Sequence, residues 1–415
     1  MSDAAQRPWL VSATTGRIVS YGDLLGKLRE VRTRKRNWLR PAGTEAALVG
    51  IARALVEDGE IALVDSDLTD AQVERLGLFR GATGDVFSEG VSAELDERLL
   101  RKKAAGESRA RIGLTTSGSS GSPRLVWQTA GNLARGVRIS PRHGRAVWGL
   151  AFRPTHIGGV HVFLQALANG CAMVDLQGLS PAQVVAAVEK FGVTHLSATP
   201  SFFRQLVGLR FRCENVLSVT AGGETVAREM IDGLARLFPA ARVRNIYAST
   251  EAGTLLVSDG ETFSIPPALR RQLEIRDGRL WVRREMVGEI AGAESSEEWF
   301  DTGDLVEFVG AESHAFRIAG RESDWVNVGG DKVNPREVEA VLEAFPGVRQ
   351  ARVFSRSNSV TGQLLCAELA CEGPPPEERA VRVYAEARLQ GHKVPRLLRF
   401  VTRIEQTWSG KVSRG

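Results

Sequence analysis

Apolar and polar residues alternate through the middle of the chain in a way that predicts strands and helices in turn. Short apolar runs at 171–176, 194–198, 215–220 and 242–247 have the length of buried strands. The first three are followed by segments with apolar residues at helical spacing, which cover 180–191, 201–207 and 226–238. Ser180 and Pro181 are typical of a helix start, because serine caps the first turn and proline fits its first position. Strands that alternate with helices at this spacing predict an α/β fold, in which helices flank a parallel sheet.

The flanking parts of the chain show other patterns. Residues 15–24 predict a turn and strand leading into a helix, residues 45–57 a helix, and residues 61–64 a strand followed by turn residues at 65–67. Beyond Glu251, strand-like runs at 272–275, 280–284 and 299–305 predict an antiparallel sheet or small barrel. From Gly320 onward, helices at 334–345 and 379–388 and strands at 348–354, 364–369 and 398–404 predict a compact α+β unit.

The composition is that of a globular protein, with 43% hydrophobic and 25% charged residues in a chain of 415. The net charge of +5 is small, and the main basic run, 27–40, fits a solvated helix face better than a nucleic-acid or membrane surface. The four cysteines form no Cys-x-x-Cys pair, and no apolar run is long enough to cross a bilayer. We therefore expect a cytoplasmic protein with reduced cysteines that binds neither nucleic acid nor membrane.

One stretch of the chain, from Thr115 to Arg124, combines hydroxyls and glycines and closes on a proline and a cation. Glycines let backbone N–H groups approach an anion, hydroxyls donate to its oxygens, and Arg124 adds positive charge, so the stretch suits a polyphosphate. It is not a Walker loop, because Gly-Lys-Ser/Thr does not follow at the required spacing. The same composition also fits a flexible linker. The stretch alone leaves both interpretations open.

Polar clusters follow two successive predicted strands. Residues 221–224 read AGGE after one strand, and residues 248–251 read ASTE after the next. In open α/β sheets, ligands bind outside the carboxyl ends of the strands. We therefore expect both clusters to line one shared site. Taken singly, each also has an ordinary explanation, since glycines form turns and a carboxylate such as Glu251 is favoured at a helix start.

The order of these clusters along the chain resembles that of a known family. The resemblance rests on residues 116–124, on YASTE at 247–251, DTGDL at 301–305, GR at 320–321, GG at 329–330 and SGK at 409–411, with SYGDL at 20–24 as an early match. Together these clusters resemble the AMP-forming, adenylate-forming enzymes, which include acyl- and aryl-CoA synthetases, peptide-synthetase adenylation domains and luciferase. The short chain is most similar to o-succinylbenzoate–CoA ligase-like members.

The resemblance implies a fold and an activity. The expected fold is a large adenylation domain over residues 1–320, with parallel sheets, flanking helices and a small antiparallel sheet or barrel, and a small mobile α+β domain over residues 321–415. The expected reaction is attack by a carboxylic acid on the α-phosphorus of ATP, helped by Mg²⁺, with later transfer of the acyl group to coenzyme A. An aromatic acid is one candidate substrate.

The resemblance also implies roles for single residues. The β- and γ-phosphates of ATP would lie against Thr116, Ser117, Gly118, Ser119, Ser120, Gly121 and Arg124. The α-phosphate, Mg²⁺ and the nucleoside would contact Thr250, Glu251, Tyr247, Gly222, Gly223, Glu224, Asp304 and Arg321. Tyr247 would stack on adenine, and Asp304 would accept the ribose hydroxyls. Glu251 supplies an oxygen ligand of the kind that Mg²⁺ prefers.

Further residues would act at the acid and in the small domain. His156 would border the acid pocket, and Lys411 would neutralise the charge that develops between the carboxylate and the α-phosphate. After a swing of the small domain about a hinge near 321–324, Gly329 and Gly330 would line the path of the CoA thiol. No Cys/His spacing predicts a zinc site.

Departures from the family pattern keep alternatives open. Arg124 stands where the family usually has lysine, Ser323 stands where it has aspartate or lysine, and the usual proline before Lys411 is absent. One alternative keeps adenylation and changes the acceptor to a carrier-protein thiol, an amine or another nucleophile. A second alternative is a catalytically silent nucleotide-binding protein.

Overall fold

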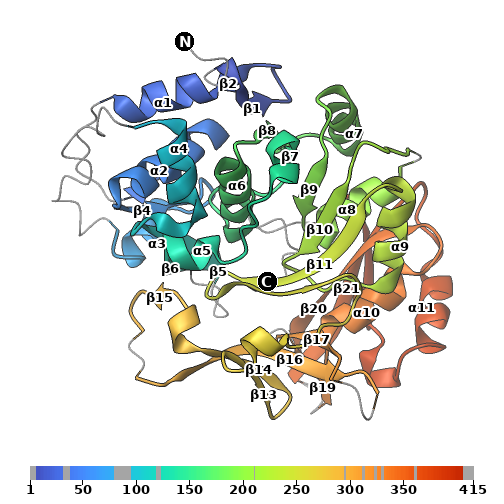
Figure 1. Cartoon of the computed structure of the whole chain (residues 1–415). Coiled ribbons are helices and arrows are strands. Elements are labelled where there is room, and N and C mark those ends of the chain that lie inside the picture. The colour runs from blue at the N-terminus through green and yellow to red at the C-terminus, as the bar shows by residue number, and fades with distance from the viewer. Residues whose placement is uncertain are drawn as a thin grey trace. The chain divides into compact units, whose positions relative to one another are not determined.

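The computed structural model describes residues 6–30, 38–78, 95–117, 123–209, 211–293, 296–310, 314–321, 325–328, 331–358 and 362–404. The chain divides into two compact units. The first contains Met1–Glu274, Trp281–Phe300 and Val309–Arg317, and the second contains Ile275–Leu280, Asp301–Phe308 and Ile318–Gly415. Two short pieces of the second unit are therefore inserted within the sequence of the first. Helices and strands carry the labels of Figure 1.

The larger sheet of the first unit, sheet A, has eight strands in the order β12-β11-β10-β9-β7-β8-β1-β2. They are β1 (Pro8–Ser12), β2 (Ile18–Ser20), β7 (Val147–Leu150), β8 (Ala172–Asp175), β9 (His195–Ala198), β10 (Ser218–Gly222), β11 (Arg242–Ser249) and β12 (Gly253–Ser258). The strands from β11 to β1 run parallel, whereas the edge strands β12 and β2 pair antiparallel. The predicted parallel sheet is confirmed.

The second sheet of this unit, sheet B, has the order β15-β6-β5-β4-β3. Its strands are β3 (Trp38–Leu39), β4 (Glu60–Leu63), β5 (Arg111–Ser117), β6 (Pro123–Thr129) and β15 (Glu289–Ile290). Strands β3, β4 and β5 are parallel, and β5 turns back into β6 as an antiparallel hairpin. Strand β15 pairs antiparallel with β6.

Helices pack on both faces of the two sheets (Figure 1). One core joins strands of both sheets to α1 (Tyr21–Arg29), α2 (Thr44–Glu57), α4 (Glu97–Lys102), α5 (Ala130–Ala134) and α6 (Ile157–Asn169). The opposite face of sheet A packs on α7 (Pro181–Lys190), α8 (Pro200–Val207) and α9 (Arg228–Leu237), and sheet B packs on α3 (Asp70–Arg75). Strand β1 shows the alternation, because Leu10 faces the first core and Val11 faces the second.

The second unit contains a three-stranded sheet covered by two helices. Its elements are β20 (Val348–Asn358), β21 (Gly362–Cys371), β22 (Leu397–Val401), α10 (Pro335–Glu343) and α11 (Glu378–Glu386), beside the hairpin of β18 (Val326–Val328) and β19 (Asp331–Val333). A further sheet, ordered β13-β14-β16-β17, draws residues from both units; its strands are β13 (Leu273–Arg276), β14 (Arg279–Arg283), β16 (Trp299–Phe308) and β17 (Phe316–Arg321). The predicted α+β unit after Gly320 is confirmed.

Several local predictions hold in detail. Ser180 caps α7, accepting from the backbone N–H of Gln183, whose side chain reaches back to the Ser180 backbone. Asn334 caps α10 in the same position before Pro335. The four cysteines are free thiols, as expected. Within the described residues, no helix is long and apolar enough to cross a membrane.

Other local predictions need correction. Residues 115–117 belong to β5, and Pro123 and Arg124 begin β6, which pairs antiparallel with β5, so both ends of the predicted ten-residue loop are strand; residues 118–122 lie outside the described residues. Ala248 and Ser249 are the last residues of β11 and do not follow the strand. In the basic run, α1 ends at Arg29, and residues 31–37 lie outside the described part of the chain.

Candidate functional site

Two polar turns lie side by side at the carboxyl edge of sheet A. Strand β10 ends at Gly222, and strand β11 runs parallel beside it with Ile246 opposite Gly222. Gly223 and Glu224 follow β10, while Thr250 and Glu251 follow β11. The two clusters predicted to share a site are therefore at adjacent strand ends. This is the edge of a parallel sheet at which ligands bind.

The turn after β10 is tied to helix α8 through Glu224. Ser201 Oγ donates to Glu224 Oε2 at 2.8 Å, and Arg204 Nη2 lies 3.9 Å from the same oxygen. The Glu224 side chain is only 6% exposed. Its other oxygen, Oε1, is buried with no hydrogen-bond partner among the described residues. The carboxylate thus fixes the turn, while the backbone of Gly222 and Gly223 remains at the strand end.

The turn after β11 is held through its backbone carbonyls, which accept hydrogen bonds from a side chain of β6 and from the residue before β15. Gln128 on β6 donates from Nε2 to the carbonyl oxygens of Thr250 at 2.7 Å and Glu251 at 2.6 Å. The Gly288 N–H also donates to the Glu251 carbonyl, at 2.7 Å. We call these three bonds the Gln128 clasp. Arg135 extends it by donating to the Ala252 carbonyl at 3.2 Å. Sequence reasoning missed Gln128, although a polar residue inside an apolar strand was a signal.

Tyr247 lies on β11 just before this turn. Its side chain is buried, and its ring meets Phe263 edge-on with 6.4 Å between the centroids. Stacking of Tyr247 on adenine stays a prediction.

The hairpin of β5 and β6 carries the predicted phosphate-binding residues. Thr116 lies opposite Arg124, and Ser117 lies opposite Pro123 at the mouth of the hairpin. Arg124 is exposed, whereas Thr115 is buried. The hairpin therefore presents the polar pair Thr116 and Arg124 next to its tip. The predicted ligands Gly118, Ser119, Ser120 and Gly121 lie outside the described residues.

His156 lies at the carboxyl end of β7, as the residue before α6. Its Nε2 is 3.8 Å from Oδ2 of Asp65, which follows β4 of sheet B. The same carboxylate accepts from Arg153 Nη1 at 2.7 Å and from Thr155 Oγ1 at 2.8 Å. We call this group the Asp65 clasp. It joins the ends of strands from two sheets.

The burial of the Asp65 clasp is uneven. The Asp65 side chain is 2% exposed, whereas the Arg153 side chain is 39% exposed. Asp67 shares the same Nη1 of Arg153, at 2.8 Å, but is 48% exposed. The sequence pattern placed Asp65 among turn residues and did not indicate this contact. Only the pairing of two distant strand ends brings the group together.

The start of α6 packs tightly on the loop that carries His156. A Cβ at Gly159 would lie 2.2 Å from the carbonyl oxygen of Arg153, a distance that no side chain can occupy. One turn further, His161 is half-buried, and its Nδ1 lies 3.3 Å from Thr254 Oγ1. Burial, aided by the nearby Arg135 charge, lowers the pKa of His161 to about 4. The His161 imidazole is therefore neutral near pH 7.

The remaining predicted residues belong to the second unit. Asp304 on β16 is 5% exposed and accepts from Arg321 Nε at 3.2 Å. The Thr302 hydroxyl accepts from the Asp304 N–H at 3.1 Å and donates to the Leu280 carbonyl at 2.7 Å, which holds the strand around Gly303. Residues 322–324, Gly329, Gly330 and Lys411 lie outside the described residues.

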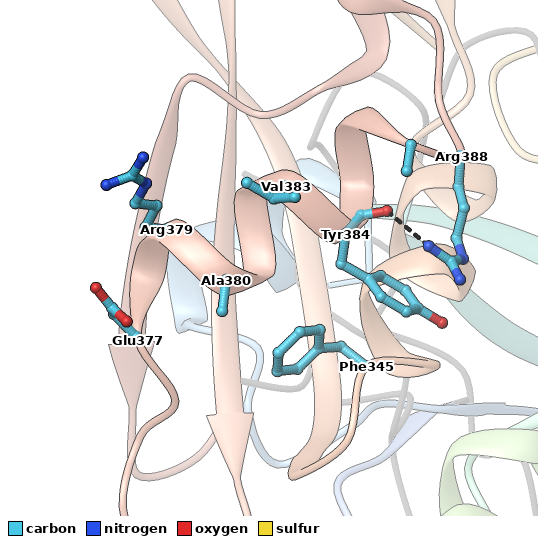
Figure 2. A pocket seen from close by; sticks show the side chains of 8 residues that line it. Phe345, Glu377, Arg379, Ala380, Val383, Tyr384 and Arg388 are labelled. Carbon is cyan, nitrogen blue, oxygen red and sulfur yellow. Dashed lines mark hydrogen bonds between the residues drawn. The ribbon is translucent and has the colours of Figure 1, made fainter.

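A shallow hollow of about 520 Å³ lies elsewhere in the second unit, between the end of α10 and α11. Figure 2 shows Phe345 and Tyr384 at its floor and Arg388 beside the tyrosine. The two rings meet edge-on at 5.3 Å, and the Arg388 guanidinium lies 3.6 Å from the Tyr384 ring centre. None of the predicted site residues lines it. Within the described residues, no group of three or more His, Cys, Asp or Glu side chains could hold a metal ion.

Comparison with known proteins identifies matches over most of the chain. The family model described as AMP-binding enzyme matches residues 56–290, and the model of its C-terminal domain matches residues 337–411. A 2-succinylbenzoate–CoA ligase from Bacillus pumilus is 26% identical over 334 residues, which are 72% of this chain and 66% of that protein. A putative long chain fatty acid–CoA ligase from Staphylococcus epidermidis is 23% identical over 274 residues, which are 63% of this chain and 59% of that protein.

Among solved structures, the chain is similar to the o-succinylbenzoate coenzyme A synthetase of Bacillus subtilis in complex with ATP and magnesium ion. The TM-score is 0.68 at 19% identity, and the match covers 98% of this chain and 95% of that chain. The fold is therefore shared over almost the whole length. The chain spans less than two thirds of the length of the two curated relatives named above.

Proposed function

Because the chain belongs to the family of AMP-binding enzymes, we propose that it activates a carboxylic acid with ATP and passes the acyl group to coenzyme A. In the first step a carboxylate oxygen attacks the α-phosphorus, and the bond to pyrophosphate breaks. In the second step the CoA sulfur attacks the acyl carbon, and AMP leaves. The names of the relatives, which are CoA ligases, support this reaction.

The observation that carries the proposal is the placement of two polar turns at adjacent strand ends, beside a hairpin that bears Thr116 and Arg124. Adenylation brings a carboxylate against a triphosphate, so the enzyme must offset the repulsion of two anions. Hydroxyls and backbone N–H groups at the edge of sheet A, together with the cation Arg124 on the hairpin of sheet B, would supply that compensation. Thr250 would donate to the α-phosphate, and the hairpin would hold the β- and γ-phosphates.

Mg²⁺ fits the donor set of this edge. In nucleotide sites the ion takes one or two carboxylates and completes its shell with phosphate oxygens and water. Glu251 is a half-buried carboxylate in the same turn as Thr250. When bound, Mg²⁺ would supply positive charge to the phosphates. Glu251 would hold the ion in place.

Further residues have proposed roles toward the nucleoside and in the second half-reaction. Tyr247 and the backbone of residues 222–224 would contact adenine, and Asp304, steadied by Arg321, would accept the ribose hydroxyls. Lys411 would approach the α-phosphate during adenylation. Gly329 and Gly330 would line the thiol path after the small domain, proposed to begin at residue 321, has turned.

The acid would bind beside His156. An aryl acid is the first class to test, because a relative bears the name of a 2-succinylbenzoate ligase. Coenzyme A is the proposed acceptor, and a carrier-protein thiol or an amine is the alternative that product analysis separates. ATP and coenzyme A are cytoplasmic metabolites, so the reaction would take place in the cytoplasm.

The deciding experiment is acid-dependent exchange of labelled pyrophosphate into ATP, over a panel of aryl, alkyl and amino acids that includes 2-succinylbenzoate. Exchange with at least one acid is expected, and a thioester should form when coenzyme A is added. Binding of ATP without exchange for any acid would instead identify a silent nucleotide-binding protein. Exchange without a thioester would point to another acceptor.

A further inference from the structure

The turn that carries Thr250 and Glu251 is fastened through its backbone to a side chain of the other sheet. The two carbonyl oxygens of Thr250 and Glu251 point at one amide nitrogen, Nε2 of Gln128, at 2.7 and 2.6 Å. Gln128 is fully buried. A primary amide has two N–H donors on one nitrogen, so a single side chain satisfies both carbonyls. The two carbonyls belong to the peptide planes 250–251 and 251–252, so fixing them orients both planes, constrains the direction of the Glu251 side chain between them and anchors the backbone that follows Thr250.

The backbone at Gly288 packs directly against this amide. Gly288 lies against it, since a Cβ at that position would come within 2.8 Å of Gln128 Nε2 and 2.7 Å of the Trp127 carbonyl oxygen. The Gly288 N–H donates to the Glu251 carbonyl as well. Glycine at position 288 therefore permits the turn, the amide and strand β15 to meet. The Glu251 carbonyl thus accepts from both the Gln128 amide and the Gly288 N–H, and Gly288 also packs against that amide.

Gln128 also belongs to the strand that leaves the phosphate hairpin. Strand β6 begins at Pro123, next to Arg124, and Gln128 is its penultimate residue. One short strand thus connects the predicted site of the β- and γ-phosphates to the turn predicted to hold the α-phosphate and Mg²⁺. Because an extended strand is stiff, the clasp sets these two phosphate-binding segments at a fixed separation.

We propose that Gln128 is a positioning residue for MgATP: it touches no substrate, but it holds Thr250 and Glu251 in the direction that the α-phosphate and the metal ion require. This inference rests on the proposed function, which places MgATP at that turn. It predicts a defect confined to steps that use the triphosphate. Steps that begin from a preformed acyl-adenylate need neither pyrophosphate nor Mg²⁺ at Glu251.

The test is the substitution Gln128→Met, which keeps length and volume and removes the amide. We expect the KM for MgATP and the half-saturating Mg²⁺ concentration to rise about tenfold, as the loss of buried hydrogen bonds to the turn would produce. The KM for the acid and the rate of thioester formation from synthetic acyl-adenylate should stay within about twofold of wild type.

A matched control is Gln165→Met. Gln165 on α6 also bonds the backbone of a distant segment, donating to the Arg138 carbonyl and accepting from its N–H, both at 2.8 Å. This variant should melt earlier without raising the KM for MgATP. A graded second variant, Gly288→Ala, should shift the MgATP parameters in the same direction as Gln128→Met, and it serves if Gln128→Met does not fold.

The outcomes separate this proposal from the proposed function. If wild type shows no pyrophosphate exchange but binds MgATP, calorimetric affinities of wild type and variant for MgATP still test the clasp, with a tenfold loss expected. If wild type binds no MgATP, both proposals fall. Equal losses in both half-reactions, or a change no larger than that of Gln165→Met, would overturn the role of Gln128 and leave the proposed function standing.

Discussion

Substitution of Asp65 by asparagine removes one charge from the Asp65 clasp while keeping the size of the side chain. The carboxylate accepts three hydrogen bonds, from Arg153 at 2.7 Å, from Thr155 at 2.8 Å and from the Asp67 N–H at 3.1 Å. Bonds to an ionised acceptor are worth about 1 kcal/mol more than neutral ones. Because Arg153 is 39% exposed, solvent screens part of its share. We expect a loss of about 2 kcal/mol, since an amide can still accept at one oxygen.

The assay is thermal unfolding together with acid kinetics. A loss of about 2 kcal/mol should lower the melting temperature by roughly 4 °C in a unit of this size. The loop that carries His156 and Thr155 would lose its anchor on sheet B, so the KM for the acid should rise several-fold while the KM for MgATP changes little. The contrast between the two Michaelis constants places the effect at the acid pocket.

The chain offers its own control for this experiment. Asp67 binds the same Nη1 of Arg153 at 2.8 Å but is 48% exposed, and exposed ion pairs contribute about 1 kcal/mol at most. Asp67→Asn should therefore leave both the melting temperature and the acid KM close to wild type. If Asp65→Asn and Asp67→Asn behaved alike, burial would not distinguish the two aspartates, and the reasoning would be wrong.

Three further predictions concern other residues. The pKa of His161 is 6.5 in the unfolded chain and about 4 in the folded protein. The contribution of His161 to the free energy of unfolding is therefore fully present above pH 6.5 and falls at lower pH, by about 2 kcal/mol at pH 5. Urea unfolding at pH 7 and pH 5 should show this drop in wild type and a smaller drop in His161→Gln. Gly159→Ala should cost about 3 kcal/mol or prevent folding, since its Cβ would lie 2.2 Å from the Arg153 oxygen. Gly26→Ala, in open space inside α1, should raise the melting temperature slightly, and equal effects of the two glycine variants would contradict the packing argument. Lys411→Ala should abolish pyrophosphate exchange and spare thioester formation from synthetic acyl-adenylate; equal loss of both would exclude a role confined to adenylation.

The elements that the sequence predicted are those whose patterns are local. Helix α7 combines a serine cap, a proline in its first turn and one apolar face, all within a short segment. Helix α6 was not predicted. Its buried residues, from Gly159 to Asn169, surround the helix on nearly every side, because it lies within the core shared by both sheets. A helix that is apolar all round shows no helical period in its sequence.

The candidate site was predictable to the extent that it lies at strand ends. The clusters after β10 and β11 could be recognised because a polar run follows an apolar one. The two clasps could not, since Asp65 meets Arg153 across 88 positions and Gln128 meets Thr250 across 122. Such contacts depend on how two sheets pack, which no local pattern encodes. The hairpin was predicted as a loop because threonine and serine occur in both loops and strands. In the structure Thr115 and Thr116 pair with Leu125 and Arg124, so they belong to a strand.

Strand β1 has a consequence for the synthesis of the protein. Leu10 and Val11 pair with Met173 and Val174 of β8, and the Tyr21 hydroxyl donates to the Cys171 carbonyl, 150 positions later, at 2.8 Å. At about 5–20 residues per second, the ribosome delivers β8 roughly 10–30 s after β1. During that interval only the hairpin partner β2 is available to β1, and its apolar side chains have no sheet to enter. Until β8 emerges, strands β1 and β2 of a nascent chain are therefore without the parallel strand that joins them to sheet A in the folded protein.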